Sequence, residues 1–412
     1  MIKKLFYLFI FFAPFTSFFA LSAWLRLPVI INQLLFITLL IALLKNNRIN
    51  TNWLVKEDLY LLSFLGLIWL SFFLGFREKR SFNHSLAYTN AILFYFFLTK
   101  YIITSFTISS IKIAKTIYWS FLTCSLIILS DFIGKNYCNI SLRGAFSKAD
   151  GIISNMDYYI RYGFLRVGGV AEEPGSMALF YNIYFGISLY YLYQKDKIKL
   201  FKWLFILFAL VHFAMLSNAG ITLTLVALII IFLINKLQNK VISKTQLFWI
   251  VGVFSLLILS SCFIIFFDIG HSNKFLEDFS NKIFFNESHK SYSSSGQRLL
   301  QWQRALVNFF KHPILGNGPG FGVHEDTEGY LSIYLTILSD IGFIAFVFFM
   351  GFIKKIIEKI MLLPIHIRNF ILFSTITLLF HIFIVADFYH APIWVLFAFV
   401  QLIYKEQKSI QP

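Results

Sequence analysis

Two polar segments in this chain contain residue types suited to binding and activating an anionic substrate. The first runs from Arg161 to Gly175 and carries Arg166 and the pair Glu172 and Glu173. An arginine guanidinium is a planar fork that matches the oxygens of a phosphate group. A glutamate near it can act as a general base or can simply pair with an arginine. The segment therefore predicts one half of an active site, with structural pairing of the glutamates as the alternative.

The second segment begins with a helix predicted between Gln297 and Pro313. At about 100° of rotation per residue, its apolar side chains share one face, which suits a helix lying on a membrane surface. These side chains are Leu299, Trp302, Leu306, Phe309 and Phe310. Arg298 falls at the edge of this face and is the better candidate for a buried ionic contact. Arg304 falls on the opposite face, where solvation is expected, and is kept as a substrate-binding candidate.

A glycine-rich loop follows this helix, with glycine at 316, 318, 320 and 322. Glycine allows a backbone to approach a ligand closely, so its amide groups are candidates for binding an anion. The run lacks the Lys-Ser/Thr pair of a phosphate-binding P-loop and is weak evidence by itself. Gly318 and the nearby His324 are therefore named as substrate-binding candidates, together with Arg143 and Arg161 of the first segment.

Composition predicts the kind of scaffold that holds these loops. Of the 412 residues, 58% are hydrophobic and 14% are charged, and the mean hydropathy is +0.72. These values exclude a soluble globular protein and predict an all-α polytopic membrane protein, because a helix of about 20 apolar residues crosses a bilayer. About twelve windows qualify, at 5–24, 27–44, 58–76, 84–104, 113–133, 175–193, 200–217, 219–235, 247–268, 329–352, 367–386 and 389–404.

The placement of Lys and Arg predicts how these helices are oriented. With both termini in the cytoplasm, most of the 36 Lys and Arg residues fall in inner segments, as the positive-inside rule requires. Two long loops, 134–174 and 269–328, then lie on the outer face of a single membrane domain that covers 1–412. The inner lysines are scattered at helix ends rather than gathered in a basic domain, which argues against nucleic acid as a partner.

The order of several short motifs resembles the O-antigen ligase and polymerase superfamily. Arg298 and Trp302 are followed by His312-Pro313-Ile-Leu-Gly316-Asn-Gly318 and then by Asp340-Ile-Gly342. In the first loop, Arg166 with Gly168 and then Glu173-Pro174-Gly175 is similar to a motif of O-antigen and capsule polymerases of the Wzy type. The resemblance covers the helix count, both long loops and roughly residues 160–342.

The resemblance implies a membrane glycosyltransferase with a GT-C-like fold in the bacterial inner membrane. Its substrate would be an undecaprenyl-diphosphate-linked oligosaccharide, used at the periplasmic face without nucleotide sugar, catalytic metal or other cofactor. Arg166 and Arg298 would hold the donor diphosphate, with Arg143 and Arg161 as secondary contacts. Glu173 or Glu172 would act as base or orient the acceptor. Membrane lipid is a further expected partner. A chain-length regulator protein is a candidate partner, and the sequence leaves open whether one binds.

One departure from the family pattern favours a polymerase over a ligase. Ligases usually carry a histidine about where this chain has Leu331. His324 lies seven residues upstream and would substitute for that histidine if the register of the loop differs. The family's Ser-Arg-Gly turn is Ser217-Asn-Ala-Gly220 here, without an arginine. A ligase that transfers finished polymer to lipid A core stays open as the alternative. A lipid-linked oligosaccharide transporter is the alternative from another class, but internal repeats and charges within the spans are not evident.

Overall fold

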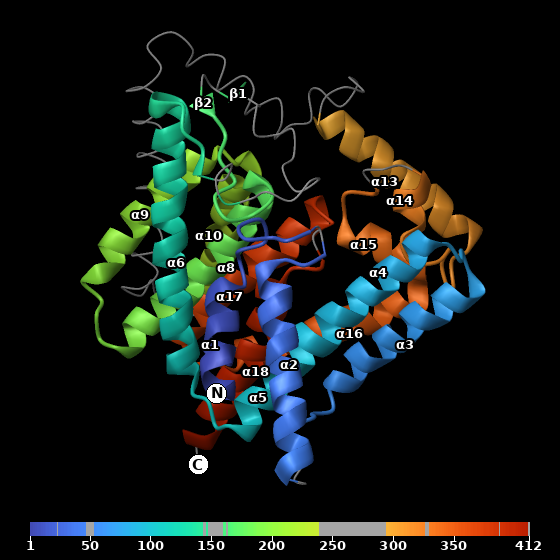
Figure 1. Cartoon of the computed structure of the whole chain (residues 1–412), viewed down its shortest axis with the longest axis horizontal. Coiled ribbons are helices and arrows are strands. Elements are labelled where there is room, and N and C mark those ends of the chain that lie inside the picture. Colours follow the sequence, from blue (N-terminus) through green and yellow to red (C-terminus); the bar gives the residue numbers. More distant parts are fainter. Residues whose placement is uncertain are drawn as a thin grey trace. The chain divides into compact units, whose positions relative to one another are not determined.

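The computed structural model describes residues 1–22, 24–46, 53–142, 146, 160–161, 164–238, 294–325, 329–386 and 388–410. These residues are mostly helical, with one antiparallel pair of two-residue strands (Figure 1). The chain divides into two compact units. The first comprises Met1–Thr38, Ile108–Glu277 and Leu363–Leu378, and the second Leu39–Thr107, Asp278–Leu362 and Leu379–Pro412.

The first unit is built around a helix that is buried on all sides. Helix α8 begins at Pro174, a residue whose missing N–H is tolerated at the first helical position. Its side chains from Ser176 to Leu192 are all buried, as expected for a helix surrounded by other helices. It packs against α6, α9 and α10 (Figure 1). The elements of this unit are α1 (Ile2–Phe12), α6 (Ser110–Ile133), η2 (Gly134–Cys138), β1 (Ile160–Arg161), β2 (Phe164–Leu165), α8 (Pro174–Gln194), α9 (Leu200–Met215) and α10 (Asn218–Gln238), with parts of α2 (Leu27–Asn46) and α17 (Ile365–Ile384).

The second unit combines apolar helices with the segment that carries the glycine loop. Helix α16 packs on α3 and α18, while the short π-helix η4 contacts α13, α14 and α15. The elements of this unit are α3 (Asp58–Leu74), α4 (Lys79–Thr89), η1 (Asn90–Leu98), α5 (Thr99–Ser105), α13 (Ser294–Lys311), α14 (Phe321–Glu325), α15 (Ile333–Thr336), η4 (Ile337–Ile341), α16 (Phe343–Met361) and α18 (Ala391–Ile410).

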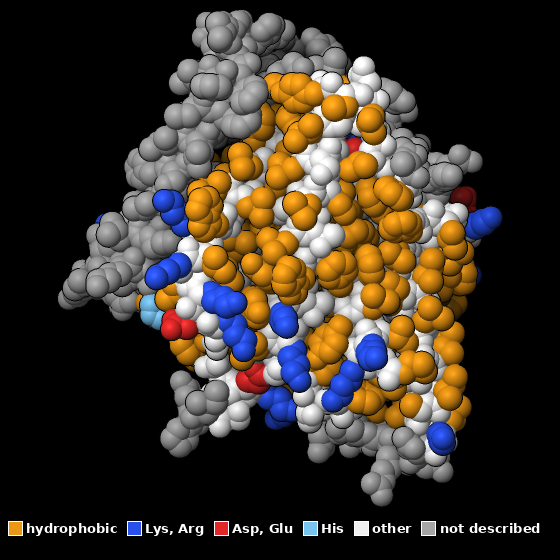
Figure 2. Space-filling view, turned by 60° about the vertical axis from the view of Figure 1, so that its left-hand side comes forward, with side chains coloured by type: hydrophobic (Ala, Val, Ile, Leu, Met, Phe, Trp, Pro, Cys, Tyr) orange, Lys and Arg blue, Asp and Glu red, His pale blue; other side chains and the backbone are white. Residues whose placement is uncertain are grey.

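Five helical stretches among the described residues are long and apolar enough to cross a membrane: Leu27–Lys45, Lys79–Ser105, Ser110–Cys138, Asn218–Leu237 and Ile365–Ile384. Apolar side chains cover most of the face shown in Figure 2, and Lys and Arg side chains gather toward one border of that apolar area. These features indicate a multi-pass membrane protein, as the composition predicts. The count of twelve spans and the GT-C-like arrangement stay predictions, and the window 247–268 lies outside the described residues.

Two of the predicted windows are wrong as single helices. In the window 5–24, helix α1 ends at Phe12, because Pro14 cannot donate a helical hydrogen bond and its ring crowds the preceding turn. In the window 329–352, Gly342 separates η4 from α16 with a φ of 95°. A hydropathy window registers apolar content and is insensitive to such backbone breaks.

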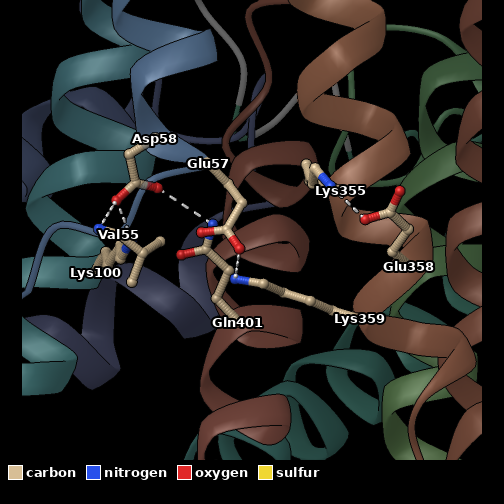
Figure 3. Close-up of polar contacts among 8 residues, drawn as sticks. All are labelled: Val55, Glu57, Asp58, Lys100, Lys355, Glu358, Lys359 and Gln401. Carbon is tan, nitrogen blue, oxygen red and sulfur yellow. Dashed lines mark hydrogen bonds and ion pairs between the residues drawn. The ribbon is translucent and has the colours of Figure 1, made fainter.

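A buried ionic cluster ties four helices of the second unit together (Figure 3). The Asp58 side chain is 1% exposed and forms an ion pair with Lys100 of α5. It also accepts hydrogen bonds from the Val55 N–H at 2.9 Å and from Gln401 Nε2 of α18 at 3.3 Å. Beside it, Lys359 Nζ of α16 lies 3.4 Å from a carboxylate oxygen of Glu57. The cluster therefore fixes one end of α3 against α5, α16 and α18.

We expect Lys100→Met to destabilise the protein strongly. Removing one partner of a buried ion pair leaves an uncompensated charge and costs about 3–5 kcal/mol. The melting midpoint of the purified protein in detergent should therefore fall, and the double variant Asp58→Leu/Lys100→Met should recover most of the loss. Lys355→Met is the control, because the Lys355–Glu358 pair is exposed and such pairs contribute about 0–1 kcal/mol. Equal midpoints for Lys100→Met and Lys355→Met would contradict this account.

Candidate active site

The glycine loop of the second unit is held by a single buried aspartate at the end of η4. The Asp340 residue is 1% exposed. Its Oδ2 accepts a hydrogen bond from the Gly320 N–H at 3.0 Å, and its Oδ1 accepts one from the Gly322 N–H at 3.2 Å. Its backbone oxygen accepts further hydrogen bonds from the Gly318 N–H at 2.8 Å and from Ser71 Oγ at 2.9 Å. Asp340 therefore sets the path of the loop from both its side chain and its backbone.

The loop glycines allow the loop backbone to lie in direct contact with the backbones of Asp340 and Phe76. Gly316 has a φ of 72°, and a Cβ there would meet the Asp340 backbone at 2.4 Å. Gly318 has a φ of 113°, and a Cβ there would meet the Phe76 N at 2.7 Å. Both positions combine a left-handed backbone with no room for a side chain. In this structure the amides of Gly318, Gly320 and Gly322 donate to Asp340, whereas the sequence predicts that such amides face an external anion.

A second network joins the end of α13 to the same loop. Asn317 Nδ2 donates to the Asn308 backbone oxygen at 3.0 Å and to the Ser339 backbone oxygen at 2.8 Å. Asn308 Nδ2 donates in turn to the Tyr330 hydroxyl at 2.9 Å and to the Glu325 carboxylate. Asn308, Asn317 and Ser339 are all buried. Because buried polar groups that all find partners form rigid networks, α13, the loop and η4 behave as one element.

The connection between α3 and α4 completes the frame around the loop. The Phe76 N–H donates to the Asn317 backbone oxygen at 2.7 Å. In the first turn of α4, Arg80 Nη1 donates to the Val323 backbone oxygen at 2.7 Å. His84 Nδ1 lies 2.5 Å from the Tyr389 hydroxyl. Residues near position 80 and residues near position 320 thus meet, which no local sequence pattern indicates.

Helix α13 presents its two arginines as the helical periodicity predicts. Arg298 is half-buried and lies on the same side as the buried residues Gln301, Ala305 and Asn308, whereas Arg304 is exposed. The Trp302 indole makes an edge contact with Phe383 at a ring distance of 5.1 Å. Three of the apolar side chains point away from the protein: Leu299, Leu306 and Phe310 are 39%, 44% and 74% exposed. An outward apolar face of this kind is compatible with the predicted contact with a membrane surface.

The first predicted segment lies in the first unit, where Arg166 follows β2 and is half-buried. Strand β2 is fixed by Asn136, whose Oδ1 accepts from the Leu165 N–H at 2.7 Å and whose Nδ2 donates to the Leu165 oxygen at 3.2 Å. Further on, Ser17 donates to the backbone oxygen of Val170 from its N–H and its hydroxyl, both at 3.0 Å. These contacts position Arg166 from both sides.

The two glutamates of this segment have different surroundings. Glu172 forms an ion pair with Arg26, and the two side chains are 26% and 24% exposed. Glu173 is the half-buried N-cap residue of α8. Glu172 thus has a structural partner, but that partner lies 146 residues away and is not one of the loop arginines. Arg26 sits between two apolar windows, and only its isolation as a charge marks it in the sequence.

Several predicted residues can be placed only in part. Arg143 and the side chain of Arg161 lie outside what the structure describes; the Arg161 backbone pairs with Phe164 between β1 and β2. His324 lies in α14, 3.4 Å from the Glu78 carboxylate. Arg166 belongs to the first unit and Arg298 to the second, so their joint action stays a prediction.

In a comparison with protein families, residues 203–350 match the O-antigen ligase family (Wzy_C). The matched region contains α13, the glycine loop and η4, and therefore Asp340 and the loop amides that it holds; Ser71 and Phe76, which also contact this frame, precede the matched region. Arg166 and the two glutamates precede it. No curated protein matches the chain.

Proposed function

We propose that this chain, a member of the O-antigen ligase/polymerase superfamily through residues 203–350, is a polysaccharide polymerase. It would join undecaprenyl-diphosphate-linked oligosaccharide repeat units into O-antigen or capsule at the periplasmic face of the inner membrane. The observation that carries this proposal is the rigid frame around Asp340. It fixes the glycine loop to α13, the helix on which the half-buried Arg298 lies.

The chemistry needs charge stabilisation and orientation more than bond activation. A polyprenyl diphosphate is already a good leaving group, so the enzyme has to hold its developing charge and align an acceptor hydroxyl. The acceptor oxygen attacks the anomeric carbon, the bond from that carbon to the diphosphate oxygen breaks, and undecaprenyl diphosphate leaves with the electron pair. We assign Arg166 and Arg298 to the diphosphate, with Arg143, Arg161 and Arg304 as secondary contacts.

The acceptor hydroxyl must lose its proton during this reaction. Glu172 and Glu173 are the candidate groups that orient the hydroxyl or accept the proton. The pairing of Glu172 with Arg26 favours a structural role for Glu172. Glu173, at the start of α8, stays a candidate for orienting the acceptor or accepting its proton.

The residue at the position of the ligase histidine supports a polymerase. Leu331 has a left-handed backbone with a φ of 50°, which costs energy for a residue other than glycine. The backbone of the turn before α15 therefore has a defined, energetically costly conformation. The Leu331 side chain at this turn, however, carries no basic group. The description of the matched family as O-antigen ligase keeps transfer of finished polymer to lipid A core as the second candidate.

Gel analysis of surface glycan from a deletion strain separates the two reactions. Loss of a polymerase leaves lipid A core capped with single repeat units. Loss of a ligase leaves uncapped core, with long polymer retained on the lipid carrier. An unchanged ladder of long chains in the deletion strain would overturn both assignments.

A further inference from the structure

An open polar surface cavity of about 360 Å³ lies beside the glycine loop in the second unit, and most of its lining residues are exposed. Its lining residues are Glu78, Lys79, Arg80, Asn83 and His324. Four of them come from the first five residues of α4 and the residue before it, and His324 comes from α14. The volume falls within the range of about 300–1,000 Å³ that is usual for small-molecule sites. None of the assignments above uses this cavity as a whole.

Contacts within the protein hold the two walls of this cavity together. Arg80 of one wall donates to the backbone oxygen of Val323, directly before His324, at 2.7 Å. His324 Nδ1 lies 3.4 Å from Glu78 Oε2. The His324 ring also packs on the Phe76 ring, with 4.4 Å between ring centroids. Since Phe76 is itself hydrogen-bonded to Asn317, the cavity is a fixed extension of the frame around Asp340.

The charges of the lining residues restrict the ligand. Lys79 and Arg80 supply two positive charges, and the start of α4 adds the partial positive charge of a helix N-terminus. Glu78, whose side chain is 55% exposed, supplies one negative charge in the same cavity. Because Glu78 lines the same cavity, it repels a further negative charge on a ligand, so a diphosphate or another multiply charged anion fits poorly. A ligand with a single negative charge matches the summed charge of Lys79, Arg80 and Glu78.

The remaining groups are suited to hydroxyls. The Glu78 carboxylate accepts hydrogen bonds, and the Asn83 amide both donates and accepts them. Together with the two cations, this set matches a molecule that carries one carboxylate and several hydroxyl groups.

We propose that this cavity binds an acidic sugar, that is, a carboxylate-bearing monosaccharide unit of the glycan. Lys79 and Arg80 bind the sugar carboxylate, while Glu78 and Asn83 bind its hydroxyls. The identification of the sugar as part of the glycan substrate rests on the proposed polymerase function; the binding of the sugar acid does not.

Binding of free ligands to the purified full-length protein in detergent tests the proposal. Ligand-observed NMR titrations with glucuronate, glucose and inorganic pyrophosphate give three apparent dissociation constants. We expect glucuronate to bind at least tenfold more tightly than glucose, because a charge-assisted contact is worth about one order of magnitude in affinity. We also expect it to bind more tightly than pyrophosphate.

Two variants and a control locate the site. Lys79→Ala should weaken glucuronate about tenfold, whereas Lys354→Ala, which removes an exposed lysine of α16, should not. Glu78→Gln should strengthen pyrophosphate binding, because it removes the repelling charge. Unchanged melting midpoints establish that the variants are folded.

The proposal is overturned if wild-type protein binds no glucuronate, prefers pyrophosphate, or binds glucuronate equally well after Lys79→Ala. These results are independent of chain growth. Failure of the polymerase assignment, read from surface glycan in the deletion strain, is therefore distinguishable from failure of the sugar-acid site.

Discussion

Replacement of Arg298 by alanine is expected to abolish long glycan chains while the protein still accumulates in the membrane. Arg298 lies half-buried on the inner side of α13, where its guanidinium can bind two diphosphate oxygens at once. Hydrogen bonds to charged groups contribute about 1.5–3 kcal/mol each, so the loss of two reduces the rate at least about 100-fold. Surface glycan on a gel and protein amount by immunoblot are the two measurements.

Three further variants make this test specific. Arg298→Lys keeps the charge but loses the planar fork, so it should also lose most long chains. Arg166→Ala is expected to act like Arg298→Ala, since both arginines are assigned to the diphosphate. Gln303→Ala is the control, because Gln303 is an exposed neighbour on α13. Normal chains in the Arg298→Lys strain would contradict bidentate binding, and normal chains in the Arg298→Ala strain would refute the assignment of Arg298.

Asp340→Ala is expected to reduce both stability and chain growth. The substitution leaves the amides of Gly320 and Gly322 without their carboxylate acceptors in a buried environment. Each such loss costs about 1–3 kcal/mol, so the melting midpoint of the purified protein should fall. The loop, and with it the end of α13, should lose its fixed position, and long chains should disappear.

Asp340→Asn gives a graded version of the same test. Asparagine keeps the shape and one acceptor oxygen, but it turns an NH₂ group toward one of the two amides. Its melting midpoint should lie between those of wild type and Asp340→Ala. Glu358→Ala, at an exposed ion pair, is the control with little effect. An unchanged midpoint in Asp340→Ala would show that this carboxylate does not hold the loop.

The Arg298 and Asp340 variants distinguish a loss of substrate binding from a loss of the folded position of the glycine loop. Arg298 variants should lose chains with little change in the melting midpoint, because the guanidinium is assigned to substrate. Asp340 variants should lose both, because the carboxylate is bonded only to the protein's own backbone in the described contacts.

Local periodicity was sufficient to predict the geometry of α13. A rotation of about 100° per residue separates Arg298 from Arg304, and the structure places one half-buried and the other exposed. The hydropathy of the chain likewise predicts a helical membrane protein, and five stretches of the described residues have the length and composition of spans. Such patterns repeat within a few residues, so they are visible without knowledge of the fold.

The frame around the candidate site could not be predicted, because its contacts join distant parts of the chain. Arg26 meets Glu172 across 146 positions, and Ser71 meets Asp340 across 269. In the sequence, Asp340 appears only as part of a family motif. Its carboxylate accepts hydrogen bonds from backbone amides, which carry no residue-specific signal. The breaks after Phe12 and at Gly342 were missed for a related reason, since apolar content continues across both.

The central claim is that this chain extends a lipid-linked glycan. The most direct measurement supplies purified protein in lipid nanodiscs with one synthetic undecaprenyl-diphosphate-linked repeat unit and no nucleotide sugar, and separates the products by size. We expect products of two, three and more repeats, with one undecaprenyl diphosphate released for each new linkage. A lipid-linked pool that stays at one repeat unit, with transfer only after lipid A core is added, would contradict it.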